Sequence, residues 1–453
     1  MDISLVIVVL GLLIFSAYIF NGLFSYTRVP NVLLLLIVGL VVGPLTSWIK
    51  PYQFGEMGPV FTSVTLVLIL FESGTKLKLD DLAASIGSAS LLTLVNFLIG
   101  SLIAGFVAYL FMGLSSIGAA FFGTIVSGTS SAIVIPMVNQ MGLNKKAGSI
   151  LLLESAISDV LCLVVGLTLL PAMKAGSFDL SVILGKIWKS FLLALLMGSV
   201  TGLAWSVILK WIRTIRNPLF SNLAFAFILY GVTEKLGLNG GMAVLGFGIV
   251  LGNAYTLQKS RLSVLIPAQE LTENEKGFFS ELAFITQTYF FVYVGIHMQF
   301  GGPTPYIAAL LIIAGILFAR PWAVRFLTRG KLPMKDLATM SLMSPKGLVP
   351  AILASLPLQR GIAEGRAIQD LAYALILLSI VLCTLFMVLT NRYPKLRDRW
   401  FAMLKVKASP EEETEEQSQE VEAVMVENAP AETDTSLPES DQNTEGTSGT
   451  TSP

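Results

Sequence analysis

The chain has few of the side chains from which enzymes and metal centres are usually built. It holds one histidine, His297, and two cysteines, Cys162 and Cys383, among 453 residues. One histidine excludes a histidine-rich metal site, and the two cysteines form neither a CxxC pattern nor a disulfide framework. The sequence also lacks an HExxH string, a P-loop and a GxSG-type string with a histidine in reach. It therefore predicts neither an enzyme nor a bound cofactor.

Charged residues are scarce as well. They make up 13% of the chain, against 54% hydrophobic residues and a mean hydropathy of +0.74. A soluble domain has about 25% charged residues, so this composition is typical of a polytopic membrane protein. We expect the lipid bilayer to surround the chain, and we expect no nucleic-acid partner.

Lysine and arginine are absent after Lys407, whereas 13 acidic residues lie between Glu411 and Glu445. The first 407 residues hold all 30 basic residues against 17 acidic ones. A polar acidic segment cannot bury enough apolar surface to fold alone. We therefore predict a transmembrane domain over residues 1–395, a basic juxtamembrane segment over 396–407 and a disordered acidic tail over 408–453.

Long apolar runs predict thirteen membrane-spanning helices. Their ranges are about 3–24, 30–48, 58–78, 85–112, 115–140, 146–172, 182–212, 218–236, 240–255, 278–299, 304–329, 335–358 and 367–391. The first residues lack the basic region of a signal peptide, so 3–24 is expected to be a retained span. With the N-terminus outside, 21 basic residues fall in cytoplasmic loops and seven on the opposite side. The positive-inside rule thus predicts an outside N-terminus, a cytoplasmic C-terminus and an odd number of spans. We expect the protein to lie in the plasma membrane.

Two of the spans are interrupted by polar or helix-breaking residues, at Ser127–Ser131 and at Ser344–Gly347. Such breaks are tolerated in a membrane only where protein or a water-filled cavity satisfies the freed backbone groups. The two interrupted spans are the fifth and the twelfth, which are seven apart. Spans 1–6 and 8–13 would then be two six-helix repeats joined by span 7, and a single linking span inverts the second repeat relative to the first. Broken helices in matching positions of inverted halves indicate the substrate site of a transporter. We expect an all-α polytopic membrane protein of about 13 transmembrane helices, with the broken helices crossing at mid-membrane.

Two carboxylates, Glu154 and Asp159, lie inside the span 146–172. A charge at bilayer depth costs ~3 kcal/mol or more, so such residues usually mark an ion or proton pathway. Ser155 and Asp159 share one helix face, whereas Glu154 points roughly 140° away from Asp159. Removal from water favours the protonated form of a carboxylate, which lets protons and cations compete for it. Asp159 is therefore the predicted exchange residue; the alternative is a buried polar residue that only holds helices together.

A series of motifs over residues 1–395 follows a specific order. They are Arg28–Pro30 leading to Gly39 and Gly43-Pro44, Leu70–Gly74, Ser127–Ser131, Glu154–Asp159, Phe291–Gly295, Arg320 and Pro345–Gly347. In this order and spacing the chain resembles the monovalent cation:proton antiporter superfamily, and most of all the NhaP-like sodium/hydrogen exchangers. The resemblance implies a secondary transporter that exchanges Na⁺, or K⁺ or Li⁺, for H⁺ by alternating access. It also implies a homodimer with a role in pH homeostasis.

The candidate cation- and proton-binding residues are Asp159, Ser155, Thr129, Glu72 and Ser158. The resemblance implies that the positions of Thr129, Ser155 and Glu72 contribute to the cation site. Serine and threonine also serve as packing residues in membrane helices, and Glu72 lies near a span end where it could reach the membrane surface. At Ser158 the exchangers generally have Asn and the electrogenic antiporters have Asp. Serine does not ionise near neutral pH, so this pair offers one titratable carboxylate, at Asp159, which favours electroneutral exchange.

Two further charges within spans are expected to have structural roles. The free-energy cost of burying an unpaired arginine at position 320 in a membrane would be prohibitive. The resembling exchangers pair the positions of Glu154 and Arg320, which implies an ion pair between these two residues. The alternative is that Arg320 reaches the membrane surface. Lys346 lies in the second break, where its ammonium could neutralise half-helix C-terminal carbonyls. A second titrating group is the other interpretation of Lys346.

Competing functions remain. A potassium/proton antiporter or potassium-efflux system is the main alternative, although residues 396–453 are too short to fold into the nucleotide-binding domain that efflux systems often carry. A potassium channel would need a filter of the TVGYG type, which the chain lacks.

Overall fold

The computed structural model describes residues 3–27, 29–55, 57–77, 79, 88–141, 143–175, 188–214, 219–254, 271–328 and 332–393. Within these ranges the regular secondary structure is helical and contains no strand, as predicted. The predicted basic segment 396–407 and acidic tail 408–453 lie outside the described residues.

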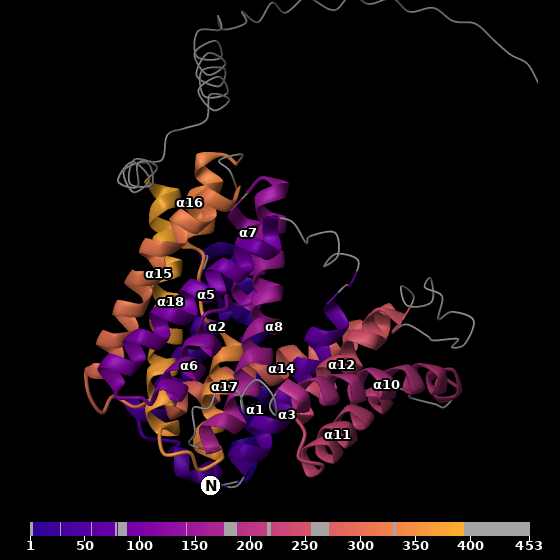
Figure 1. The fold of residues 1–453 in the computed structure, drawn as a ribbon. Coiled ribbons are helices and arrows are strands. Elements are labelled where there is room, and N and C mark those ends of the chain that lie inside the picture. Colours follow the sequence, from indigo (N-terminus) through magenta and orange to yellow (C-terminus); the bar gives the residue numbers. More distant parts are fainter. Residues whose placement is uncertain are drawn as a thin grey trace, which may run out of the picture. The chain divides into compact units, whose positions relative to one another are not determined.

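The helices of the described ranges follow the predicted spans (Figure 1). In chain order they are α1 (Ile3–Thr27), α2 (Asn31–Leu40) with the π-helical turn η1 (Val41–Leu45), the 3₁₀ turn η2 (Pro51–Phe54), α3 (Met57–Lys76), α5 (Ser88–Met112), α6 (Ser116–Val126), α7 (Ser131–Met141), α8 (Lys145–Ala175), α10 (Trp188–Ile212), α11 (Leu219–Lys235), α12 (Gly240–Gly252), α14 (Glu273–His297), α15 (Thr304–Thr328), α16 (Met334–Leu342), α17 (Leu348–Gln359) and α18 (Gly365–Arg392). Each of the thirteen predicted ranges overlaps one α-helix, or two α-helices where a break was predicted.

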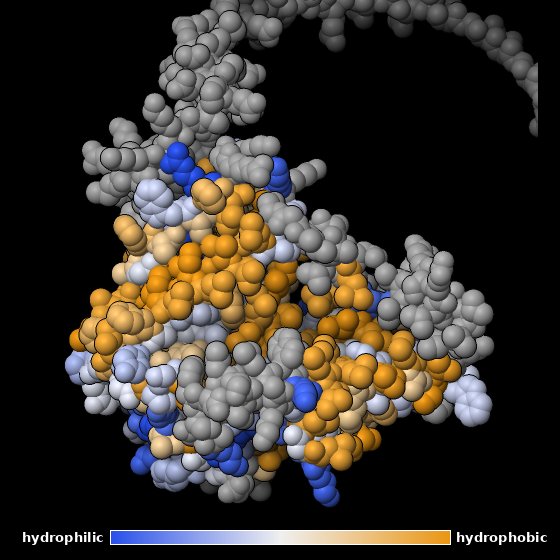
Figure 2. Space-filling view, viewed as in Figure 1, coloured by the Kyte–Doolittle hydropathy of each residue, from blue (hydrophilic) through white to orange (hydrophobic). Residues whose placement is uncertain are grey.

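Nine stretches of the described helices are long and apolar enough to cross a membrane, and three shorter apolar helices accompany them. Large hydrophobic side chains point outward from these helices, such as Leu102 at 73% and Phe318 at 69% exposure. Hydrophobic residues accordingly cover much of the face shown in Figure 2. Outward-facing leucine and phenylalanine suit contact with lipid. The chain is an all-α multi-pass membrane protein; the count of thirteen spans stays a prediction.

The described helices pack as two bundles. The first bundle contains α1, α2, α3, α10, α11, α12 and α14, and the second contains α5, α6, α7, α8 and α15–α18. Contacts within each bundle are extensive, whereas few contacts, such as those of α17 with α3 and α14, join the two. Small residues allow the closest approaches inside the first bundle. A Cβ on Gly74 of α3 would lie 2.7 Å from the carbonyl oxygen of Leu245 in α12.

Two of the helix contacts in the first bundle mirror each other. α2 packs against α14 and α3 packs against α12. α2 and α3 are the second and third predicted spans, and α12 and α14 are the ninth and tenth. If the second span corresponds to the ninth and the third to the tenth, exchanging the repeats turns the α2–α14 contact into the α12–α3 contact. This is the contact pattern that two repeats related by a two-fold axis would produce. The inverted repeats themselves stay a prediction.

The structure has both helix breaks where the sequence indicates them. One separates α6 from α7 and the other separates α16 from α17. α7 and α16 lie toward one end of the second bundle, and α6 and α17 lie toward the other (Figure 1). The backbone N–H of Ser130 donates a hydrogen bond to the carbonyl of Pro345 at 2.9 Å. A Cβ on Gly347 would lie 2.0 Å from Ser130 Oγ, so only glycine permits this approach of the two breaks.

Candidate cation-binding site

A cavity of about 440 Å³ lies between helices of the two bundles. The first bundle contributes residues of α3 and α14 to its wall, and the second contributes residues of α7, α8 and α17. Its polar and charged lining residues are Glu72, Ser73, Lys76, Ser130, Ser131, Asp159, Ser280 and Gln287. Asp159 and Glu72, the two carboxylates in this lining, therefore come from opposite bundles.

Asp159 is half-buried in the wall that α8 provides. Ser131 Oγ donates a hydrogen bond to its Oδ2 at 2.5 Å. Ser131 is the first residue of α7, and the N-terminus of a helix carries partial positive charge that stabilises a nearby carboxylate. Asp159 thus lies where the first helix break, a helix N-terminus and the cavity meet.

The hydroxyls predicted to bind the cation lie behind this wall rather than in it. Ser155 is fully buried, and its Oγ donates to the carbonyl of Thr129 at 2.9 Å and lies 3.1 Å from Ser131 Oγ. Ser158 Oγ accepts the N–H of Thr129 at 3.1 Å and donates to the carbonyl of Ser155 at 3.1 Å. Thr129, Ser155 and Ser158 do not line the cavity; they fix the break next to Ser131 and Asp159.

Glu72 lines the cavity from α3, and its side chain is 16% exposed. Its Oε1 accepts hydrogen bonds from Lys76 Nζ and, at 3.0 Å, from Ser280 Oγ of α14. The Glu72 carboxylate therefore lies in the cavity wall, bonded to Lys76 and Ser280.

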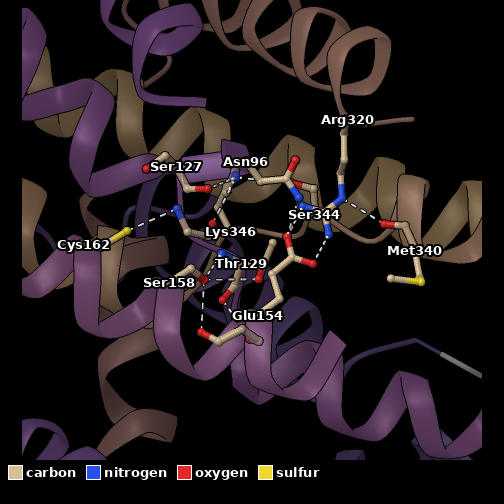
Figure 3. A network of polar contacts seen from close by, with 12 residues as sticks. Asn96, Ser127, Thr129, Glu154, Ser158, Cys162, Arg320, Met340, Ser344 and Lys346 are labelled. Carbon is tan, nitrogen blue, oxygen red and sulfur yellow. Dashed lines mark hydrogen bonds and ion pairs between the residues drawn. The ribbon is translucent and has the colours of Figure 1, made fainter. Parts of the chain in front are cut away.

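Glu154 and Arg320 are in contact in the interior of the second bundle, with 1% and 4% of their side chains exposed (Figure 3). The guanidinium of Arg320 faces both carboxylate oxygens, with Nη1–Oε1 and Nη2–Oε2 distances of 2.8 Å. Arg320 Nε donates to the carbonyl of Met340 at 2.9 Å, and Asn96 Nδ2 donates to Glu154 Oε1 at 2.8 Å. The Arg320 side chain thus points into the bundle and joins α15 to α8 and α16, while Glu154 joins α8 to α5 through Asn96.

Lys346 is 1% exposed and lies between the two breaks (Figure 3). Its Nζ donates to the carbonyls of Gly128 at 3.0 Å and Ser127 at 3.3 Å, and to Ser344 Oγ at 3.2 Å. Both carbonyls directly follow α6, where the negative end of the helix dipole lies. This geometry is the one expected for charge compensation, and Lys346 does not line the cavity that contains Asp159.

Several residues that complete the site were not predicted as functional. Ser131 belongs to the polar string Ser127–Ser131, which could have identified it. Asn96 is the one amide in the apolar sequence of α5, which is also a readable signal. Ser280 carries no such signal, because it reaches Glu72 across 208 residues of sequence.

Comparisons with known proteins agree with this architecture. The model of the family described as "Sodium/hydrogen exchanger, transmembrane" matches residues 11–391. The chain is 24% identical to the K⁺/H⁺ antiporter NhaP of Alkalimonas amylolytica, over 84% of this chain and 65% of that protein. It is 27% identical to the probable Na⁺/H⁺ antiporter 2 of Methanocaldococcus jannaschii, over 79% of this chain and 85% of that protein.

The solved structure of the sodium proton antiporter MjNhaP1 from Methanocaldococcus jannaschii has the same fold. It superposes with a TM-score of 0.66 at 22% identity, covering 85% of this chain and all of that one. The chain spans just under two thirds of the length of the K⁺/H⁺ relatives from Alkalimonas and Shewanella, at 65% and 61%. Because the family match extends over residues 11–391 and the fold agrees with it, the chain belongs to the transmembrane sodium/hydrogen exchanger family.

Proposed function

We propose that the protein exchanges a monovalent cation, Na⁺ in the first place, for H⁺ by alternating access. The observation that carries this proposal is the position of Asp159, half-buried in a cavity between two bundles and bonded to Ser131 at a helix break. A carboxylate in such a place can hold either a proton or a hard cation, which hydroxyl and carbonyl oxygens help to coordinate. The function is transport rather than enzymatic catalysis.

Exchange is proposed to be electroneutral. The hydroxyl of Ser158 is engaged with the backbone of Thr129 and Ser155 and supplies no ionisable group beside Asp159. One proton on Asp159 is then replaced by one monovalent cation. The Glu154–Arg320 pair and Lys346 hold the broken helices in place, and Glu72 receives the cation on the opposite wall.

K⁺ is the second candidate cation, since K⁺/H⁺ antiporters are among the relatives at 24% and 25% identity. We infer that the protein lies in the plasma membrane as a homodimer, with its N-terminus outside. In this orientation the cavity opens toward the cytoplasm, because Lys76 at the C-terminal end of α3 lies on the cytoplasmic side.

Asp159→Asn tests the proposal, since the amide keeps the shape of the side chain but cannot exchange a proton for a cation. We expect proton flux in proteoliposomes, followed with a pH-sensitive dye and driven by Na⁺, K⁺, Li⁺ or Rb⁺, to disappear. Asp370→Asn is the matched control, because Asp370 of α18 pairs with Arg366 outside the cavity and should keep exchange. Wild-type flux from a correctly inserted Asp159→Asn protein would refute the proposed role.

A further inference from the structure

Three charged side chains line the cavity within the described residues: Asp159, Glu72 and Lys76. The side chain of Lys76 is 62% exposed, whereas that of Glu72, one helical turn earlier in α3, is 16% exposed. Lys76 therefore lies at the mouth of the cavity and Glu72 lies deeper. A cation that enters along this wall meets the positive charge of Lys76 first.

The ammonium of Lys76 occupies the carboxylate that a cation would use. Lys76 Nζ and Ser280 Oγ both donate to the same oxygen, Glu72 Oε1. Glutamate and lysine four residues apart often pair on an exposed helix face without further consequence. Here the pair faces a cavity that also contains Asp159, and a hydroxyl from α14 fixes the acidic partner. A cation must displace Lys76 before it can bind this oxygen.

We propose that Lys76 determines the cation affinity of this site: its tethered ammonium competes with the incoming monovalent cation for Glu72. The proposal rests on the proposed function only in naming the ligand as the transported cation. With Lys76 present, the charged lining residues sum to one negative charge when both carboxylates are ionised. Without Lys76 they sum to two, and the cavity attracts cations more strongly.

The size of the effect follows from Coulomb's law. We take the displaced ammonium of Lys76 to lie about 7 Å from the bound cation. At that separation one unit charge changes the affinity for a monovalent cation by about threefold in water-like surroundings and by about fiftyfold near a protein surface. We therefore expect Lys76→Gln to tighten cation binding by about tenfold. Lys76→Arg retains the charge and should bind the cation more weakly than Lys76→Gln does.

The test measures equilibrium binding to the purified full-length protein at fixed pH. Na⁺ and K⁺ are titrated separately by calorimetry into wild type, Lys76→Gln, Lys76→Arg and the double variant Lys76→Gln/Glu72→Gln. Lys335→Gln is the matched control, since Lys335 is an exposed lysine of α16 that does not line the cavity. We expect tighter binding for Lys76→Gln, loss of that gain in the double variant and wild-type affinity for Lys335→Gln.

The outcomes separate this proposal from the proposed function. Unchanged or weaker binding by Lys76→Gln, or an equal gain for Lys335→Gln, would overturn the role of Lys76 even if wild type exchanges cations for protons. Absence of binding of either cation in every variant would overturn it too. Conversely, tighter binding by Lys76→Gln in a protein that performs no cation/proton exchange would support competition at Glu72 and refute the proposed function.

Discussion

Loss of either partner in the Glu154–Arg320 pair should destabilise the protein strongly. Arg320→Gln leaves the carboxylate of Glu154 buried with Asn96 as its remaining donor among the described contacts. Glu154→Gln leaves a guanidinium that cannot lose its proton at 4% exposure. Breaking a buried pair in this way costs about 3–5 kcal/mol, because the remaining charge is uncompensated.

The double variant Glu154→Gln/Arg320→Gln should recover part of the loss, because two amides in the same place carry no charge. The measurement is the melting temperature of each purified variant in detergent, where each single change is expected to lower Tm by roughly 5–10 °C. Arg366→Gln serves as the control. Its pair with Asp370 is 3.5 Å long, Arg366 is 51% exposed, and exposed pairs contribute about 0–1 kcal/mol.

Two results would refute this reasoning. If the two single losses simply add in the double variant, Glu154 and Arg320 are not energetically coupled. If Arg320→Gln lowers Tm no more than Arg366→Gln does, the buried pair does not hold the helices together.

Three further outcomes are expected. Ser131→Ala removes the hydroxyl that contacts Asp159 and whose oxygen can help to coordinate the bound cation. Loss of this ligand should raise the half-saturating cation concentration about tenfold in the proteoliposome flux assay, which corresponds to about 1.4 kcal/mol; an unchanged value would contradict a role for this hydroxyl. Truncation after Lys407 should leave exchange intact, as the acidic segment has too little apolar content to pack; a truncated protein that inserts normally and loses all flux would disprove this. Na⁺-driven proton flux should be insensitive to a valinomycin-set K⁺ potential, once K⁺ transport has been excluded, whereas electrogenic exchange would gain or lose ~2.3 kcal/mol per charge per 100 mV.

Much of this architecture was predictable from the sequence, because a bilayer leaves few options for polar residues. Glycine, serine and proline within apolar runs predicted both helix breaks, and the helical period separated the face of Asp159 from that of Glu154. Periodicity does not reveal which side of a helix faces an open space. Ser155 lies on the predicted helix face, but Ser131 stands between it and the cavity. Whether Ser155 reaches the cavity depends on where α7 begins, which the period of α8 does not show. The contact of Glu72 with Ser280 depends on tertiary packing and has no local sign in the sequence.

The distribution of the interior charges along the chain has a consequence for biosynthesis. Glu154 is 166 residues upstream of Arg320, and the carbonyl of Ser127 is 219 residues upstream of Lys346. At translation rates of about 5–20 residues per second, the earlier groups are made roughly 10–40 s before their partners exist. During that time α6 and α8 hold polar groups whose final partners are missing. The first half of the domain must therefore keep these groups near water or in the insertion machinery until α15–α17 arrive, and nascent chains arrested before Arg320 should be especially prone to degradation.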